Sequence, residues 1–219
     1  MDSNQNNLVE WYGAFTCNRY ICLEFEHLDK SLYDFMKDRS FQRLLLKEIR
    51  PIVKEVANAL DYLKAAGIIH ADIKFENIIL VNHAKEPYRL KVIDFGLAHE
   101  VSDADQGACI QSLPFRSPET LVGLPYTEAM DMWSLGCVAA SLYLGCLLYP
   151  GSTEYDMTQR FSSKTTMDKC VESSDRILFG DLLCGMLEFD AAKRLSPRQV
   201  LQHQFSSMQD MVSRYHLSP

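Results

Sequence analysis

The sequence predicts an α+β fold in which a small amount of β structure precedes a mainly helical body. Short runs of aromatic and β-branched residues stand near the amino terminus, a pattern typical of strands. An amphipathic segment at residues 49–63, and most of the chain after Pro118, show instead the spacing of helices. With 219 residues the chain can bury one sizeable core.

The amino-terminal part is predicted to contain a β-hairpin and a short helix. The first eight residues are polar, and we expect them to be loose. The runs "LVEWYGAF" and "RYICLEFE", separated by "TCN", predict the hairpin. The stretch "KSLYDFMKDR" predicts the short helix.

The clearest predicted helix comes next. Gly67 stands where a carboxy-terminal cap belongs, and Pro51 must lie in the first turn or kink the helix. Its apolar residues fall on one face: Ile49, Ile52, Val53, Val56, Ala57, Leu60 and Leu63.

A second hairpin is predicted where "NIILV" and "RLKVI" are joined by the polar "NHAKEPY". The pattern after it is helical and closes with "SPRQVLQHQF". There Ser196 is the expected N-cap, Pro197 the first helical residue and Gln199 the capping-box partner.

Composition excludes several classes of function. A formal net charge of −7 disfavours a dedicated nucleic-acid surface, so no direct nucleic-acid partner is expected. The seven cysteines are odd in number and scattered, and they include no CxxC pair. This argues against a disulfide framework or a zinc site and indicates reduced thiols in an intracellular protein. The start, "MDSNQNNLVE", lacks the basic and apolar regions of a secretory signal.

One uncharged run, from Met132 to Tyr149, reaches the lower limit of length for a membrane span. It contains serines and glycines, follows Asp131 and ends at Pro150, and no basic residues flank it. A helix that is apolar on all sides is also what the centre of a helical domain requires. We therefore predict a buried central helix and no membrane contact, with a membrane-anchored protein as the weaker alternative.

Polar residues gather at the ends of the second predicted hairpin. Asn77 opens the first strand and Asp94 follows the second, so an antiparallel pairing brings their oxygens together. Oxygen ligands of this kind suit Mg²⁺. Asp72 and Lys74 precede the first strand, where a carboxylate could orient a hydroxyl and an ammonium could neutralise a transferring phosphoryl group.

Three motifs in order resemble those of eukaryotic protein kinases. "HADIKFEN" resembles their catalytic loop, "DFG" at residues 94–96 their magnesium motif, and "SPE" at residues 117–119 the end of their activation segment. "DMWSLG" from Asp131 and the Arg194 of "DAAKRLSP" resemble the helix-anchoring Asp and the Arg that pairs with the "SPE" glutamate. Lys74 is typical of serine/threonine kinases.

A narrower resemblance is to the homeodomain-interacting protein kinases. It rests on "HAD" in place of the commoner "HRD", and on "EPYRLKVIDFG", "GLPYTEAMDMWSLGC" and "LYPGSTEYD". It implies a protein-kinase-like fold, ATP and Mg²⁺ as cofactors, a protein substrate or partner, and residence in the nucleus, with the cytoplasm as the alternative.

The resemblance also assigns roles to residues. Asp72 would be the catalytic base and Lys74 the phosphate contact. Phe25 would stand at the back of the nucleotide pocket, and His70 and Phe95 would belong to a hydrophobic stack behind the site. The residues implied to bind Mg²⁺ are Asn77 and Asp94, and those implied to bind ATP are the hinge residues Glu26, His27 and Leu28 together with Ile79.

The implied organisation is a single kinase-like domain over residues 1–219. Residues 1–28 would be a remnant of the small lobe with the hinge, 29–210 a mainly helical large lobe, and 211–219 a tail. Only Gly13 precedes Gly67, so no GxGxxG phosphate loop lies upstream of the catalytic loop, and no VAIK-like lysine is present.

Further departures from the family pattern lie downstream. Cys109 stands where the family has its activation-loop tyrosine, and Leu113 and Pro114 replace an expected Arg-Tyr pair. Ala71 replaces the catalytic-loop arginine. The region from Tyr155 to Phe179 is shorter than the family's substrate-docking insert.

The sequence is therefore compatible with two functions. One is a serine/threonine kinase that transfers the ATP γ-phosphate to protein hydroxyls. The other is a catalytically inactive pseudokinase or fragment that binds a partner protein, which the missing lysine and the open edges of the first hairpin favour.

Overall fold

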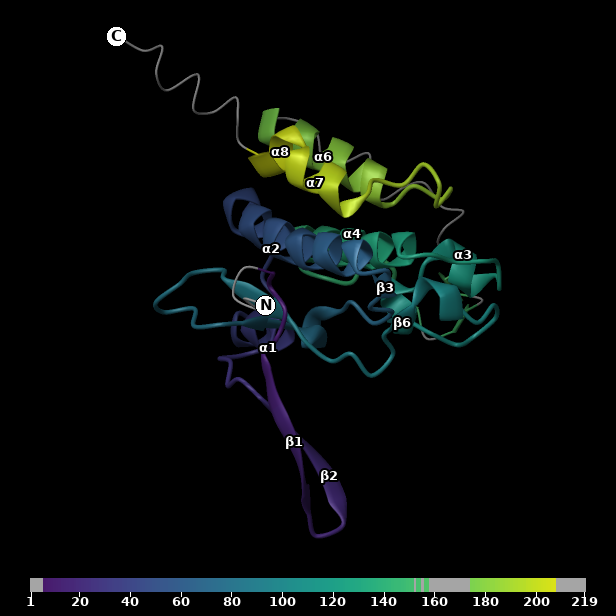
Figure 1. Ribbon diagram of the computed structural model, residues 1–219. Helices are drawn as coiled ribbons and strands as arrows, with labels where there is room; N and C mark the ends of the chain where they lie inside the picture. Colours follow the sequence, from purple (N-terminus) through teal and green to yellow (C-terminus); the bar gives the residue numbers. More distant parts are fainter. Residues whose placement is uncertain (1–5, 152, 155, 158–173, 208–219) are drawn as a thin grey trace.

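The computed structural model describes residues 6–151, 153–154, 156–157 and 174–207. It has the predicted α+β architecture. Figure 1 shows helices α6 (Ser174–Met186), α7 (Pro197–Gln202) and α8 (Gln204–Ser207) lying over α2 and α4, while the first hairpin projects from the opposite side. The predicted tail and most of the shortened region between residues 155 and 179 lie outside the described residues.

The first hairpin is confirmed and pairs β1 (Trp11–Cys17) with β2 (Tyr20–Phe25) in antiparallel register. Strand β1 begins later than predicted, at Trp11, and continues to Cys17, because only Asn18 and Arg19 form the turn, with φ of 47° and 70°. Two successive left-handed residues match the right-handed twist of a hairpin. Every residue of the two strands except Gly13 and Cys22 is exposed, and the large apolar side chains face solvent on both faces of the hairpin.

The expectation of a loose amino terminus is wrong for Asn7 and Leu8. Asn7 is buried, its amide donates to the Leu90 carbonyl at 2.9 Å and to Glu55, and its oxygen accepts from Asn58 at 2.7 Å. Leu8 forms a parallel bridge with Val92. Hydrogen bonds of side-chain amides hold this segment against the body. A hydropathy pattern does not predict such bonds, so the sequence did not indicate that the segment is ordered.

The predicted short helix is α1 (Leu32–Asp38). Its N-cap is Ser31, whose hydroxyl accepts from the Asp34 amide at 3.0 Å.

The long predicted helix is α2 (Leu46–Ala65), and its predicted apolar face is buried. Pro51 lies inside α2, beyond the first turn. Gly67 follows the helix with φ of 71°, the left-handed conformation expected of a residue after a cap.

Helix α4 (Ala129–Leu144) is the predicted buried central helix. Every residue from Met130 to Leu142 is buried, and α2, α6 and the short helix η3 (Leu113–Phe115) pack around it. No helix within the described ranges has both the length and the apolarity needed to cross a membrane.

The carboxy-terminal helices close the body over α2. Ser196 and Gln199 form the predicted capping box at the start of α7. Arg50 of α2 donates to the Phe205 carbonyl at 2.6 Å and pairs with Asp175 of α6 at 2.8 Å. These contacts fix the helical layers relative to each other.

Two short strand pairs position the site. The predicted second hairpin is confirmed as β4 (Ile78–Leu80) paired with β5 (Leu90–Val92). A second pair, β3 (Ile68–Ile69) with β6 (His99–Glu100), was not predicted because two residues are too few for a strand pattern. Together they bring the segments before β4 and after β5 to one place.

Candidate functional site

The loop that carries Asp72 is held by a buried aspartate of the central helix. Asp131 accepts the His70 amide at 2.8 Å and the Ala71 amide at 3.0 Å, one on each carboxylate oxygen. Burial raises the pKa of the Asp131 carboxyl, and the two amide donors act against that effect. Ala71 has φ of 64°, so the loop turns sharply at this anchor.

His70 lies behind the loop as a packed residue. Its Nε2 contacts the Ile93 carbonyl at 3.0 Å, and its Nδ1 accepts the Asp72 amide at 3.2 Å. The neutral tautomer with hydrogen on Nε2 satisfies both bonds. The ring is fully buried and meets Phe95 edge-on at 5.2 Å, so the stack of His70 and Phe95 implied by the resemblance is present.

The Asp72 carboxylate is the centre of a polar cluster. Oδ2 accepts from Lys74 Nζ at 2.6 Å and from Asn77 Nδ2 at 3.0 Å, while Oδ1 accepts from the Ser112 hydroxyl at 2.8 Å. Asp72 is 6% exposed, so the ion pair with Lys74 is shielded from bulk water. The arrangement presents a fixed carboxylate and an ammonium to a hydroxyl-bearing group.

Asn77 and Asp94 are brought together by the β4–β5 pair. The Ile93 amide donates to the Asn77 carbonyl at 3.0 Å, which places the following residue, Asp94, beside the start of β4. Asp94 has φ of 64° and accepts the Gly96 amide on Oδ1 at 3.1 Å.

The donor set at this place suits a hard cation. Asn77 uses its side-chain nitrogen toward Asp72, and within the described residues no donor contacts its side-chain oxygen or Asp94 Oδ2. No group of three or more His, Cys, Asp or Glu side chains forms a metal cage in the described part of the chain. Two oxygens from protein fit an ion such as Mg²⁺ that completes its shell with water and phosphate.

A cavity of about 1070 Å³ lies between the hairpin and this cluster. Of the predicted ATP-binding residues, Glu26, Leu28 and Ile79 line it, as does the metal candidate Asp94, whereas His27 is exposed and is not among its lining residues. Its other lining residues include Val9, Trp11, Leu23, Phe25, Ile93 and Phe95.

Comparison with known proteins assigns the architecture. The protein kinase domain family matches residues 1–206. The chain belongs to the protein kinase family. Homeodomain-interacting protein kinase 1 of Mus musculus is 37% identical over 99% of this chain and 24% of its own length, and the Caenorhabditis elegans protein of that name is 50% identical over 71% of this chain and 18% of its own.

A third relative, homeodomain-interacting protein kinase 4 of Homo sapiens, is 42% identical over 73% of this chain and 26% of its own length. The chain thus spans about a quarter of the length of the curated relatives it matches. The resemblance to the homeodomain-interacting protein kinases, drawn from the motifs, is confirmed.

The roof of the kinase cavity is built differently from its floor. The floor belongs to the body, because the Asp29 amide donates to the Leu80 carbonyl at 2.9 Å and Ser31 bridges Ile79. The roof is the exposed hairpin, joined to the body through Glu26, whose carboxylate accepts the Glu10 amide at 2.7 Å and pairs with the buried ammonium of Lys91. The Glu26 carboxylate therefore has a structural role, since these contacts together join the hairpin to the body.

The activation segment of the kinase domain is organised by a residue that sequence reasoning missed. Gln111 is 4% exposed, its amide nitrogen donates to the Ser134 hydroxyl at 2.8 Å, and its oxygen accepts the Ser117 amide at 3.0 Å and the Thr120 hydroxyl at 2.7 Å. Ser112, also missed, joins this segment to Asp72. A lone glutamine or serine in a loop carries no signal of its own, because its partners lie far away in the sequence.

The predicted Glu119 and Arg194 pair is confirmed. Arg194 Nη1 and Nη2 lie 2.7 and 2.9 Å from the two carboxylate oxygens of Glu119, and both residues are buried. This bidentate pair ties the end of the activation segment to the helical body. Arg116 pairs with Glu154 and donates to the Gln111 carbonyl at 3.1 Å. These contacts hold the segment against the helical body.

Proposed function

We propose that this kinase domain binds Mg²⁺-ATP in the cavity under the hairpin and transfers the γ-phosphate to a serine or threonine hydroxyl of a protein. The observation that carries the proposal is the hydroxyl of Ser112: it donates to Asp72 Oδ1 at 2.8 Å, and the Ser112 oxygen accepts from Lys74 Nζ at 3.3 Å. A substrate hydroxyl could take the same contact.

The chain's own residues would act by position and charge. Asp72 would orient the acceptor hydroxyl and take its proton as the oxygen bonds to the γ-phosphorus, while the bond from that phosphorus to the bridging oxygen breaks and ADP leaves. Lys74 would place its ammonium beside the transferring phosphoryl group. Asn77 holds the Asp72 carboxylate and backbone at 3.0 and 2.9 Å, so the base cannot swing away.

Asn77 and Asp94 are the residues proposed to hold Mg²⁺, which would neutralise charge on the ATP phosphates when bound. Ile79 and Leu28 would contact the adenine from the floor of the cavity. The backbone between residues 26 and 28 would supply polar contacts, since the Glu26 side chain is engaged by Lys91.

The sequence holds no glycine-rich loop or strand lysine before the catalytic loop. Those groups position the phosphates in other kinases. We therefore expect slow phosphotransfer by this chain, since each tenfold loss of rate corresponds to about 1.4 kcal/mol of transition-state stabilisation.

A second function, binding of a partner protein without catalysis, is favoured by one observation. The hairpin exposes large apolar side chains on both faces, among them Tyr20 at 75% and Ile21 at 79% exposed. A patch of this kind, with open strand edges, suits the addition of further strands by another chain.

The test is the thermal midpoint of the purified chain with and without Mg²⁺-ATP, together with transfer of labelled phosphate to a protein substrate. Nucleotide at about a hundred times its dissociation constant should add roughly 2.7 kcal/mol, or about 5 to 10 °C at this chain length. Asp94→Asn should abolish the shift. Asp72→Asn should keep the shift and lose the transfer.

The matched control is Asp181→Asn, which makes the same charge change on an exposed side chain of α6. It should leave both readouts unchanged. A folded chain that shows no shift at any nucleotide concentration would refute nucleotide binding and leave partner binding as the function. Residence in the nucleus or cytoplasm remains a prediction, which microscopy of a tagged chain would test.

A further inference from the structure

The loop that carries Asp72 is held at Ala71 from two sides. The Ala71 amide donates to Asp131 at 3.0 Å, and the Ala71 carbonyl accepts the backbone amide of Gln111 at 3.1 Å. Ala71 and Gln111 have φ of 64° and 62°, so this bond joins two left-handed residues, neither of them glycine. Such conformations cost free energy and persist only where the surroundings enforce them, which points to a functional constraint at this contact.

The side chain of Gln111 closes a ring of hydrogen bonds around this contact. Its Nε2 donates to the Met130 carbonyl at 3.1 Å, and Met130 directly precedes Asp131 in α4. The ring thus has four members, which are Ala71, Asp131, Met130 and Gln111. Each of them is at most 4% exposed, so water does not compete for these bonds, and a bond that is lost here leaves a buried polar group without a partner.

A primary amide of this length is the group that the position requires. The Gln111 nitrogen donates to the Met130 carbonyl and the Ser134 hydroxyl, and its oxygen accepts from the Ser117 amide and the Thr120 hydroxyl. Both donors and both acceptor sites of the amide are therefore used. The reverse orientation would set the oxygen against the Met130 carbonyl and the nitrogen against the Ser117 amide, so the partners fix which way the amide lies.

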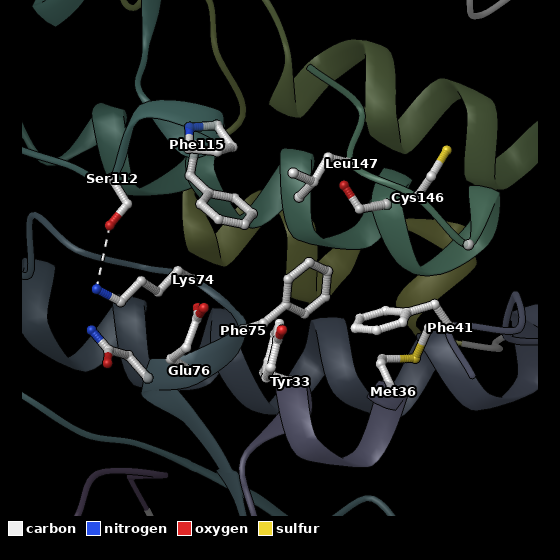
Figure 2. A pocket seen from close by; sticks show the side chains of 14 residues that line it. Tyr33, Met36, Phe41, Lys74, Phe75, Glu76, Ser112, Phe115, Cys146 and Leu147 are labelled. Atoms are coloured by element: carbon white, nitrogen blue, oxygen red, sulfur yellow. Dashed lines mark hydrogen bonds between the residues drawn. The ribbon is translucent and has the colours of Figure 1, made fainter. Parts of the chain in front are cut away.

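The backbone that Gln111 holds continues directly into Ser112. The Ser112 hydroxyl donates to Asp72 Oδ1 at 2.8 Å, and Lys74 Nζ donates to the Ser112 oxygen at 3.3 Å, the contact drawn as a dashed line in Figure 2. Ala71, which Gln111 also contacts, directly precedes Asp72. A shift of either segment would therefore move the Asp72 carboxylate relative to an acceptor hydroxyl.

We propose that Gln111 is a positioning residue for phosphoryl transfer: its side chain keeps the activation segment and the loop that carries Asp72 in one register, so that Asp72 stays directed at the acceptor hydroxyl. This inference rests on the proposed function, because it names the residue that sets the geometry of the same site. Gln111 does not line the cavity under the hairpin. It therefore acts on the rate of the chemical step and not on the binding of Mg²⁺-ATP.

The first readout is kinetic and uses Gln111→Met, which keeps a long side chain and removes its hydrogen bonds. The kcat for transfer to a protein substrate should fall about ten- to a hundredfold. The KM for Mg²⁺-ATP and the thermal shift that it causes should be unchanged. Gln111→Asn should behave in the same way, because asparagine tolerates a left-handed backbone but is one methylene too short to reach all the partners.

The second readout is hydrogen exchange, which does not depend on catalysis. Neither the Ala71 amide nor the Asp72 amide donates to Gln111, so their exchange reports what the ring transmits to the loop. In Gln111→Met the exchange of both amides should rise about tenfold or more. This rise is counted beyond any rise at the Val56 amide, which lies in the buried face of α2 and reports global unfolding.

A milder variant and a matched control complete the design. Thr120→Val keeps the shape of the side chain and removes one donor to Gln111, so exchange at the two loop amides should rise about two- to tenfold. It serves where Gln111→Met does not fold. Ser196→Ala removes the N-cap hydroxyl of α7 and lowers stability without touching the ring, so its kcat should equal that of the wild type.

An unchanged kcat in folded Gln111→Met, or loop exchange that rises no more than that of Val56, would overturn the inference. An equal loss of kcat in Ser196→Ala would also overturn it, because lower stability would then explain the loss. The two readouts separate this inference from the proposed function. Transfer that is insensitive to Gln111→Met keeps the kinase function and refutes the role of Gln111. Faster loop exchange in Gln111→Met, with no transfer by the wild-type chain, supports the hold of Gln111 on the loop and refutes the catalytic proposal.

Discussion

The hairpin β1–β2 and the helix α4 are both built from apolar residues, yet they meet opposite environments. In α4, Trp133 and Leu135 are fully buried, whereas in the hairpin Trp11 is 61% and Ile21 79% exposed. The helix is surrounded by α2, α6 and η3, while each strand of the hairpin contacts mainly its own partner. Apolar composition alone therefore does not predict whether a segment is buried against other elements of the fold.

The same contrast divides the cavity between the hairpin and the body. The floor is part of the body, where the neighbouring loop that carries Asp72 is anchored to α4 through Asp131. The roof is the hairpin, held near its base by Glu26. We therefore expect substitutions in the body to affect stability strongly and those in the hairpin to affect it little.

The largest effect should come from breaking the buried pair in the body. Arg194→Met leaves the buried carboxylate of Glu119 without its partner and should lower the free energy of unfolding by about 3–5 kcal/mol. Urea unfolding followed by circular dichroism would measure it. The double variant Arg194→Met with Glu119→Met removes both charges and should recover much of the loss. A double variant no more stable than the single one would contradict the assignment of the cost to an unpaired charge.

An intermediate effect should come from the anchor of the catalytic loop. Asp131→Asn keeps one acceptor and turns an NH₂ group toward the other amide, so the free energy of unfolding should fall by about 1–3 kcal/mol. Hydrogen exchange at the His70 and Ala71 amides should rise together with this loss. Unchanged protection of both amides would show that the loop does not depend on Asp131.

The smallest effect should come from the hairpin. Ile21→Thr removes an exposed apolar group and keeps a β-branched residue, so the free energy of unfolding should change by less than about 0.5 kcal/mol. Urea unfolding followed by circular dichroism would measure this change. A fall of several kcal/mol in the free energy of unfolding would show that Ile21 is packed in solution. It would contradict the view that the hairpin contributes little to stability compared with the body.

Much of the fold could be predicted because its signals are local. The face of α2, the capping box at Ser196 and both hairpins follow from periodicity and turn residues, and the structure contains each of them. The motifs around Asp72 and Asp94 also stand in short stretches of sequence. Asn7 and the pair β3–β6 were missed, because their stability comes from partners far along the chain.

The sequence by itself determined the family and the order of the elements, because short-range patterns specify these. Only the tertiary structure decided which residues meet. It joined Ser112 to Asp72, assigned the Glu26 side chain to Lys91 and formed the cavity between the hairpin and the body. It also separated a buried apolar helix from an exposed apolar hairpin. Burial and hydrogen bonding depend on which distant segments pack together, and that is a property of the whole fold.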